Sequence, residues 1–168
     1  MRIETQRLII TRFTPDMAEA VHLGSMDEDT QRFLPDEVFP TTEIAAEVIC
    51  DLIDCYDGTE GPYVYPFLLR DGTYAGYVQL VAIAGGWEVG YHTVKSHTSR
   101  GYATEALTAF LPAIMARLGL RQVLGVCDAA NVASIRVLEK CGFRQVFAGN
   151  DLYQGEMRPV VKLVYQST

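Results

Sequence analysis

The sequence predicts one mixed α/β domain over residues 1–168, with helices on both faces of a mostly antiparallel sheet. Three β-rich runs follow one another, separated by turns at Asp71-Gly72 and Gly85-Gly86, which is typical of an antiparallel meander. After this meander, helical and strand patterns alternate, as they do when helices pack against a sheet. The 168 residues, of which 49% are hydrophobic, are enough for one core, and no linker or repeat divides them.

The N-terminal part of the chain is predicted to form a strand and two helices. Arg7–Phe13 is rich in β-formers, and Thr14 followed by Pro15 favours a helix that begins there and runs to about Met26. A polar stretch with two prolines then leads to Thr41–Cys55, where apolar residues recur at helical spacing. We expect this second helix to be amphipathic.

The central and C-terminal parts supply the rest of the sheet. The longest helix carries an apolar stripe and ends at Gly119, and Pro112 is expected to kink it because proline removes one helical hydrogen bond. In chain order, the predicted elements are the strands Tyr63–Arg70, Tyr74–Ala82 and Trp87–Val94, the long helix Tyr102–Leu118, the strand Gln122–Cys127, the short helix Asn131–Cys141, and the strand pair Arg144–Leu152 and Val160–Tyr165.

The composition argues against several classes of function. With 14 Lys+Arg against 21 Asp+Glu the net charge is -7, which opposes nucleic-acid binding and favours cationic small molecules or basic peptide ends. No run approaches the ~20 apolar residues of a membrane span, and the charged N-terminus is unlike a signal peptide. The four cysteines form no CxxC pair, so we expect free thiols, no metal site and a cytoplasmic protein.

The segment that joins the last meander strand to the long helix predicts an anion site. N–H groups at a helix start point outward and carry partial positive charge, and the small residues Gly101 and Ala103 let an anion approach the main chain. Arg100 adds a planar set of donors that suits phosphate oxygens. The alternative is that Gly101 only permits a turn while Thr98 or Ser99 caps the helix.

A second segment, Asn131–Phe143, follows a strand and opens the short helix. Asn131 is either an N-cap, or a side chain that offers a donor and an acceptor to an amide-bearing ligand between two strand ends. Ser134, one turn further on, would then face the same cleft.

Together the two segments resemble the GNAT superfamily of acetyl-CoA-dependent N-acetyltransferases. The resemblance rests on Arg-Gly-Tyr-Ala-Thr-Glu-Ala over Arg100–Ala106 and on Asn-x-x-Ser-x-x-Val-Leu-Glu-Lys-x-Gly-Phe over Asn131–Phe143. It is strongest with the branch that includes the ribosomal-protein-alanine N-acetyltransferases. In this family a Gln/Arg-x-x-Gly-x-Gly/Ala loop binds the CoA pyrophosphate. The chain matches that loop at Gly101 and Ala103 and has Thr98 at its first position.

The resemblance implies the GNAT fold, in which the sheet splays between its fourth and fifth strands, here Trp87–Val94 and Gln122–Cys127. Acetyl-CoA lies in that opening, and its pantetheine pairs like an added strand with main-chain groups near His92 and Val94, while Asn131 meets its amides. The residues expected to bind acetyl-CoA are therefore His92, Val94, Thr98, Ser99, Arg100, Gly101, Tyr102, Ala103, Thr104 and Asn131.

The resemblance also implies that an amine attacks the thioester directly, within a ternary complex. Glu88 is the predicted base because it lies on the central strand near the splay; the alternative is that it faces solvent or pairs with an arginine. Ser134 matches the serine that this branch places near the sulfur, and is expected to hydrogen-bond the leaving thiolate unless it only satisfies the helix start. Leu138 stands where many relatives have a tyrosine acid. For Tyr91, packing is the usual role of a lone strand aromatic.

The predicted function is transfer of an acetyl group from acetyl-CoA to a primary amine, either a protein N-terminal α-amine or a small-molecule amine. Specificity is expected in the first helices, the 31–40 loop and the terminal hairpin near Tyr153. Acidic residues between Asp27 and Glu37 favour a cationic acceptor, or are simply solvated. The alternative function is a CoA-binding sensor or interaction module without turnover, and a homodimer through the terminal strands stays open.

Overall fold

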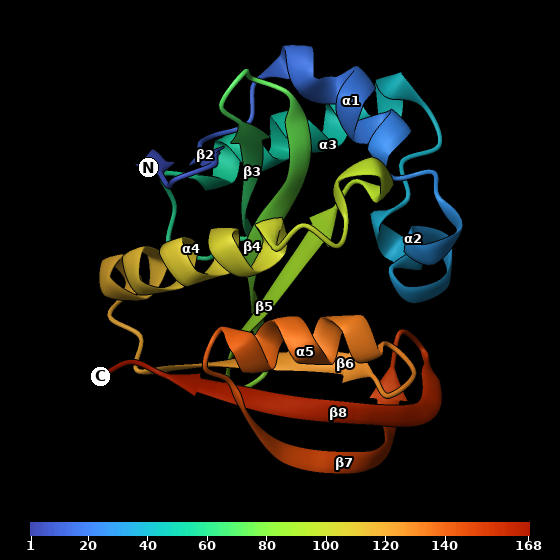
Figure 1. Cartoon of the computed structure of the whole chain (residues 1–168), viewed down its shortest axis with the longest axis vertical. Helices are drawn as coiled ribbons and strands as arrows, with labels where there is room; N and C mark the ends of the chain where they lie inside the picture. The colour runs from blue at the N-terminus through green and yellow to red at the C-terminus, as the bar shows by residue number, and fades with distance from the viewer.

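A computed structural model describes residues 1–168 and contains one eight-stranded sheet with strand order β1-β2-β3-β4-β5-β6-β8-β7 (Figure 1). The predicted mixed α/β fold is confirmed. The strands are β1 Ile3–Glu4, β2 Leu8–Ile10, β3 Tyr63–Leu69, β4 Tyr74–Ile83, β5 Gly86–Thr93, β6 Gln122–Asp128, β7 Arg144–Tyr153 and β8 Glu156–Gln166. The helices are α1 Ala18–Gly24, α2 Glu28–Phe33, α3 Thr42–Cys55, α4 Tyr102–Leu118 and α5 Val132–Lys140, with short 3-10 turns at Pro15–Met17, Pro35–Glu37 and Lys95–His97.

The sheet consists of two antiparallel units that meet at one parallel pair. The meander β3–β4–β5 is antiparallel as predicted, and β6, β8 and β7 form the second unit. The parallel pair β5–β6 joins them, with only Glu88 opposite Leu124 and Val89 opposite Gly125 in register. Because β5 continues to Thr93, the two strands separate after Val89. The sheet therefore opens between β5 and β6, as expected from the resemblance.

Helices cover both faces of the sheet (Figure 1). The main core lies under α4, where Phe110 is fully buried in one cluster with Val89 of β5. A smaller core under α1 and α3 contains Ile49 and Tyr77. Side chains alternate along a strand, so Val89 points toward α4 while its neighbour Glu88 points to the opposite face. One face of β5 thus packs toward α4, and the opposite face lies on the side of the sheet that α1 and α3 cover.

The N-terminal region differs from the prediction in two places. The strand is Leu8–Ile10 rather than Arg7–Phe13, and the 3-10 turn Pro15–Met17 precedes α1. Where a polar connection was expected, the chain forms α2, whose N-cap Asp27 accepts a hydrogen bond from the Thr30 N–H. This six-residue helix buries one residue, so it has no apolar periodicity that could reveal it.

The long helix α4 has its predicted bounds. It continues through Pro112, which is exposed, and ends at Gly119, whose φ of 65° is left-handed. Among all the helices, none has the length and the apolar character needed to cross a membrane.

Candidate functional site

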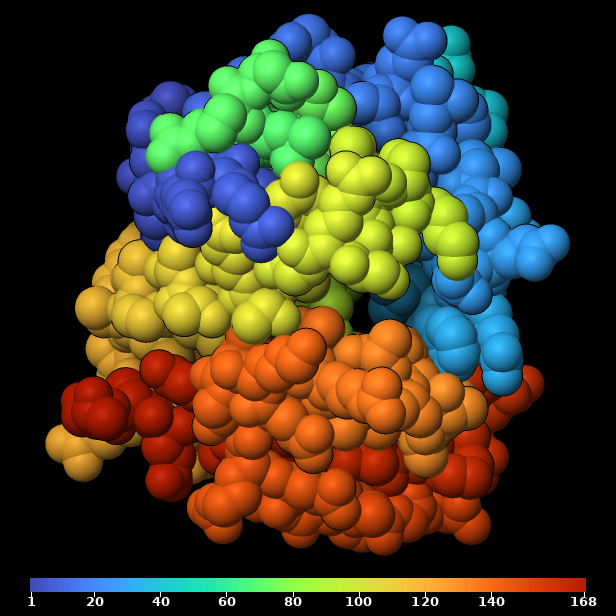
Figure 2. Space-filling model, in the orientation of Figure 1, coloured from blue at the N-terminus to red at the C-terminus, as the bar shows by residue number.

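A cavity of about 540 Å³ occupies the opening between β5 and β6. Figure 2 shows the hollow where the segment before α4, α2 and α5 approach one another. Of the residues predicted for the site, Val94 and Arg100 do not line the cavity. The others do: Glu88, His92, Thr98, Ser99, Gly101, Tyr102, Ala103, Thr104, Asn131 and Ser134.

The loop before α4 presents a run of unpaired main-chain donors. Ser99 and Gly101 adopt left-handed φ values of 61° and 78°, and Gly101 is the N-cap of α4 without any side-chain cap. The six successive N–H groups from Ser99 to Thr104 donate to no acceptor within the chain. Thr98 uses its hydroxyl to donate to the Lys95 carbonyl at 2.8 Å. The alternative of a Thr98 or Ser99 cap is therefore wrong, and the loop is a concave set of donors suited to an anion.

Arg7 contacts both this loop and the start of α4, which the sequence analysis did not predict. Its Nη1 donates to the Arg100 carbonyl at 2.7 Å and its Nε to Glu105 at 2.6 Å. The guanidinium also lies 4.6 Å from the centre of the Tyr102 ring. Because Glu105 lies in the first turn of α4, Arg7 ties the loop and the helix start to the N-terminal strands.

The main-chain groups of β5 that face the opening belong to Tyr91 and Thr93. The Val94 N–H donates to the Ala75 carbonyl at 2.8 Å, and the Val94 carbonyl accepts from the His97 N–H at 2.8 Å. Both main-chain groups of Val94 are therefore used inside the chain, and Val94 does not line the cavity, so the geometry favours Tyr91 and Thr93 over Val94 for the pantetheine. In an antiparallel pair the main-chain N–H and C=O groups of successive residues point alternately to the two sides of the strand. The main-chain groups of His92 therefore point toward β4, like those of Val94, whereas those of Tyr91 and Thr93 point toward the β6 side.

Glu88 lies at the closed end of the opening, next to the last registered pair of β5 and β6. Its carboxylate makes no hydrogen bond and no salt bridge, so the alternative of an arginine pair is not observed. Burial raises the pKa of Glu88 above its ordinary value, and the positive charge of Lys162 opposes that shift. A half-buried, unpaired carboxylate with a raised pKa is suited to accept a proton near neutral pH.

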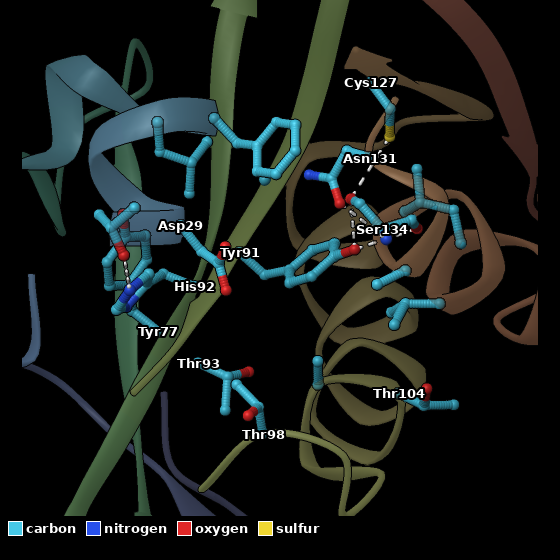
Figure 3. A pocket seen from close by; sticks show the side chains of 18 of the residues that line it. Asp29, Tyr77, Tyr91, His92, Thr93, Thr98, Thr104, Cys127, Asn131 and Ser134 are labelled. Carbon is cyan, nitrogen blue, oxygen red and sulfur yellow. Dashed lines mark hydrogen bonds between the residues drawn. The ribbon is translucent and has the colours of Figure 1, made fainter. Parts of the chain in front are cut away.

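A hydroxyl pair lies on the other face of β5 (Figure 3). The Tyr91 and Ser134 hydroxyl oxygens are 2.5 Å apart, and the Cys127 Sγ donates to Ser134 Oγ at 3.4 Å. The Ser134 hydroxyl thus forms hydrogen bonds with the Tyr91 and Cys127 side chains, and does not only satisfy main-chain groups at the start of α5. Asn131 does cap α5, because its Oδ1 accepts from the Ser134 N–H at 3.3 Å, and its amide nitrogen stays unbonded. Leu138 is 2% exposed and packs over Gly125, and its hydrocarbon side chain has no proton to donate.

The face of β5 that carries Glu88 forms a second wall with β4 and α2. His92 is buried, its Nε2 lies 2.8 Å from the Thr30 hydroxyl, and its ring stacks on Tyr77 with centroids 5.5 Å apart. Burial lowers the pKa of His92. The Tyr77 hydroxyl donates to Glu37 at 2.9 Å. Tyr153 of the terminal hairpin completes this side, in the regions where acceptor specificity was expected.

Residues 7–144 match the family model of the acetyltransferase (GNAT) domain. This chain is a GNAT acetyltransferase. It is 27% identical over 148 residues to the uncharacterized N-acetyltransferase YnaD of Bacillus subtilis, a match that covers 86% of this chain and 84% of that protein.

Two solved structures show the same GNAT fold. A GNAT-family acetyltransferase from Bacillus anthracis superposes with a TM-score of 0.85 at 24% identity, covering 99% of this chain and 98% of that one. RimL, described as a ribosomal L7/L12 alpha-N-protein acetyltransferase in complex with coenzyme A, superposes with a TM-score of 0.84 at 18% identity over 99% and 98% of the two chains. The GNAT assignment thus agrees with the opening between β5 and β6.

Proposed function

We propose that this GNAT acetyltransferase transfers an acetyl group from acetyl-CoA to a primary amine within a ternary complex. One observation carries the proposal: the opening between β5 and β6 has unpaired main-chain donors at its wide end and the unpaired carboxylate of Glu88 at its closed end. From Val89 to Thr93 the strand spans about 13 Å, which separates the two ends.

The residues of the opening fit acetyl-CoA as a substrate. The N–H groups from Ser99 to Thr104 suit its diphosphate, and the main-chain groups of Tyr91 and Thr93 suit the amides of its pantetheine. The unbonded amide nitrogen of Asn131 adds a donor on the opposite side. Arg136 and Lys140 of α5 line the same cavity and supply positive charge for phosphate groups.

The chemistry needs a proton acceptor on one face and a hydrogen-bond donor on the other. Glu88 takes a proton from the incoming ammonium, directly or through water, and the neutral amine attacks the thioester carbon. The carbon–nitrogen bond forms, the carbon–sulfur bond breaks, and the sulfur leaves with the electron pair. The nitrogen gives up its second proton, which reaches the sulfur through water or the Tyr91–Ser134 hydroxyl pair, so the products are a neutral amide and the free thiol of CoA. Ser134 donates a hydrogen bond to that sulfur, and Tyr91, hydrogen-bonded to Ser134, replaces the acid that is absent at Leu138.

The test is release of free CoA thiol from acetyl-CoA in the presence of a panel of amines. Amine-dependent thiol release and an acetylated amine product are the expected result. Tight CoA binding without turnover for any amine would instead support the alternative of a sensor or interaction module. The protein N-terminal α-amine and the small-molecule amine are both included in the panel, as a short peptide and as alkyl and aryl amines.

A further inference from the structure

A second cavity of about 290 Å³ adjoins the Glu88 side of the main cavity. Glu37, Tyr77 and Gln79 line both cavities, so the two share one wall. Beyond that wall the lining is mostly apolar, and comes from α1, α3 and the sheet under them. It includes Phe13, Val21, Val48, Leu52, Val64 and Val81.

The apolar cavity begins within one strand spacing of the predicted base. Val81 on β4 lies directly opposite Glu88 on β5. Directly opposite residues of an antiparallel pair point to the same face with Cβ atoms about 5 Å apart. A group bound over Val81 is therefore close to an amine held at Glu88.

The wall between the cavities depends on a glycine. Gln79 lies opposite Gly90, and a Cβ built on Gly90 would lie 2.6 Å from the Gln79 Nε2. Without that Cβ, the Gln79 side chain lies over Gly90 of β5, where it lines both cavities. Glu37 borders the same wall, where it accepts a hydrogen bond from Tyr77. The Glu37 carboxyl, whose pKa is raised by burial, thus borders the entrance to the apolar cavity and offers a hydrogen-bond acceptor to a primary amine there.

We propose that the apolar cavity receives part of the acceptor, and that the acceptor is a primary amine joined by a short linker to an apolar group about the size of a phenyl ring. This inference rests on the proposed acetyl transfer at Glu88. A cavity of about 150 Å³ lined by aliphatic side chains is enough to hold benzene. The second cavity is larger, and a linker of about two carbon atoms matches the spacing between Glu88 and Val81. A polyamine or an amino sugar would leave its polar groups unpaired against this lining.

The test compares 2-phenylethylamine with ethylamine, which lacks the ring, using thiol release from saturating acetyl-CoA. In the unmodified chain kcat/KM is at least about tenfold higher for 2-phenylethylamine, because discrimination by an apolar pocket is of that order. Val48→Phe fills the cavity and lowers kcat/KM for 2-phenylethylamine by about tenfold, while ethylamine changes by less than about twofold. Ile44→Phe is the matched control, because Ile44 is 39% exposed on the same helix and does not line the cavity.

Equal kcat/KM values for the two amines, or an equal loss for both in Val48→Phe, would overturn this inference while leaving acetyl transfer intact. Turnover of no amine at all would overturn the proposed function and the inference together. If Val48→Phe does not fold, Val48→Ala carries the test, since the enlarged cavity should raise kcat/KM for 2-(1-naphthyl)ethylamine relative to ethylamine. Absence of that gain would overturn the inference as well.

Discussion

The Tyr91 and Ser134 hydroxyl oxygens lie 2.5 Å apart and join β5 to α5 across the opening in the sheet. The Tyr91 hydroxyl also lies 3.0 Å from the Ser134 carbonyl, so its one proton is held by the Ser134 oxygens at the first turn of the helix. Burial raises the pKa of Tyr91, which keeps its proton in place at neutral pH. The pair is thus a protonated donor beside the place proposed for the leaving sulfur.

Ser134→Ala and Tyr91→Phe should each lower kcat, by about 10²-fold if the pair protonates or hydrogen-bonds the leaving sulfur. Because the two hydroxyls act as one unit, the double variant should be little worse than the more impaired single variant. Steady-state kinetics with saturating acetyl-CoA measures this. Unchanged kcat in both single variants, with the chain folded, would remove the pair from the mechanism.

Glu88→Gln should lower kcat/KM by about 10²–10⁴-fold while CoA affinity stays nearly unchanged, because the amide keeps the shape but cannot accept the proton. Thiol release gives the rate, and calorimetric titration with CoA gives the affinity. A rate loss of less than about threefold would exclude Glu88 as the base.

The pH dependence of kcat gives an independent test of Glu88. Its pKa is raised above the ordinary 4.5 by burial, so the carboxyl is protonated and inactive below the raised pKa and becomes active above it. The unmodified chain should therefore lose activity as pH falls, with a midpoint above 4.5. The Glu88→Gln variant should lack this loss of activity at low pH, and its pH profile should show only the ionisation of the acceptor amine. Identical acid limbs in the two proteins would contradict the assignment.

Gly101→Val should weaken CoA binding by about tenfold or more, because a side chain is strained at a φ of 78° and would displace the run of N–H groups. The new Cβ would meet only Arg7 Nη2, at 3.4 Å, so the variant should fold. Gly72→Val is the matched control, since Gly72 has a φ of 92°, open space around it and a place in the distant β3–β4 turn. Equal CoA affinities in the two variants would show that strain at Gly101 does not matter.

Arg7→Ala should weaken CoA binding and lower the melting temperature by about 2–4 °C, the shift that ~1 kcal/mol produces in a chain of this size. The physical reason is the loss of its bonds to the Arg100 carbonyl and to Glu105. Arg2→Ala removes an exposed ion pair with Glu4 away from the loop and should change neither quantity. A drop in melting temperature without any change in CoA affinity would make Arg7 purely structural.

Periodicity and turn residues were enough to predict the parts of the fold that have strong local signals. The helix Tyr102–Leu118 was predicted with its exact bounds because it has an apolar stripe and a terminal glycine. The helix Glu28–Phe33 was not predicted, since it is short and buries only Thr30, which contacts His92 of β5. Local patterns carry no information about such tertiary contacts.

The sequence predicts which segments line the site, but it does not predict which main-chain groups and side chains point into it. Which β5 residues face the opening depends on the hydrogen-bonding phase of the β4–β5 ladder, which the sequence does not encode. The sequence therefore predicts His92 and Val94, whereas the ladder turns the main-chain groups of Tyr91 and Thr93 toward the opening. A lone strand aromatic predicts packing for Tyr91, and no local pattern reveals its hydrogen bond to Ser134, which is distant in the sequence. The wall formed by Glu37 and Gln79 likewise depends on contacts between separate elements.

The most direct test of the central claim is a crystal structure of the chain in complex with CoA. The claim predicts diphosphate oxygens within hydrogen-bonding distance of the N–H groups between Ser99 and Thr104, and pantetheine amides paired with Tyr91 and Thr93 of β5. A diphosphate bound elsewhere, with those N–H groups facing solvent, or a pantetheine outside the gap between β5 and β6, would contradict it.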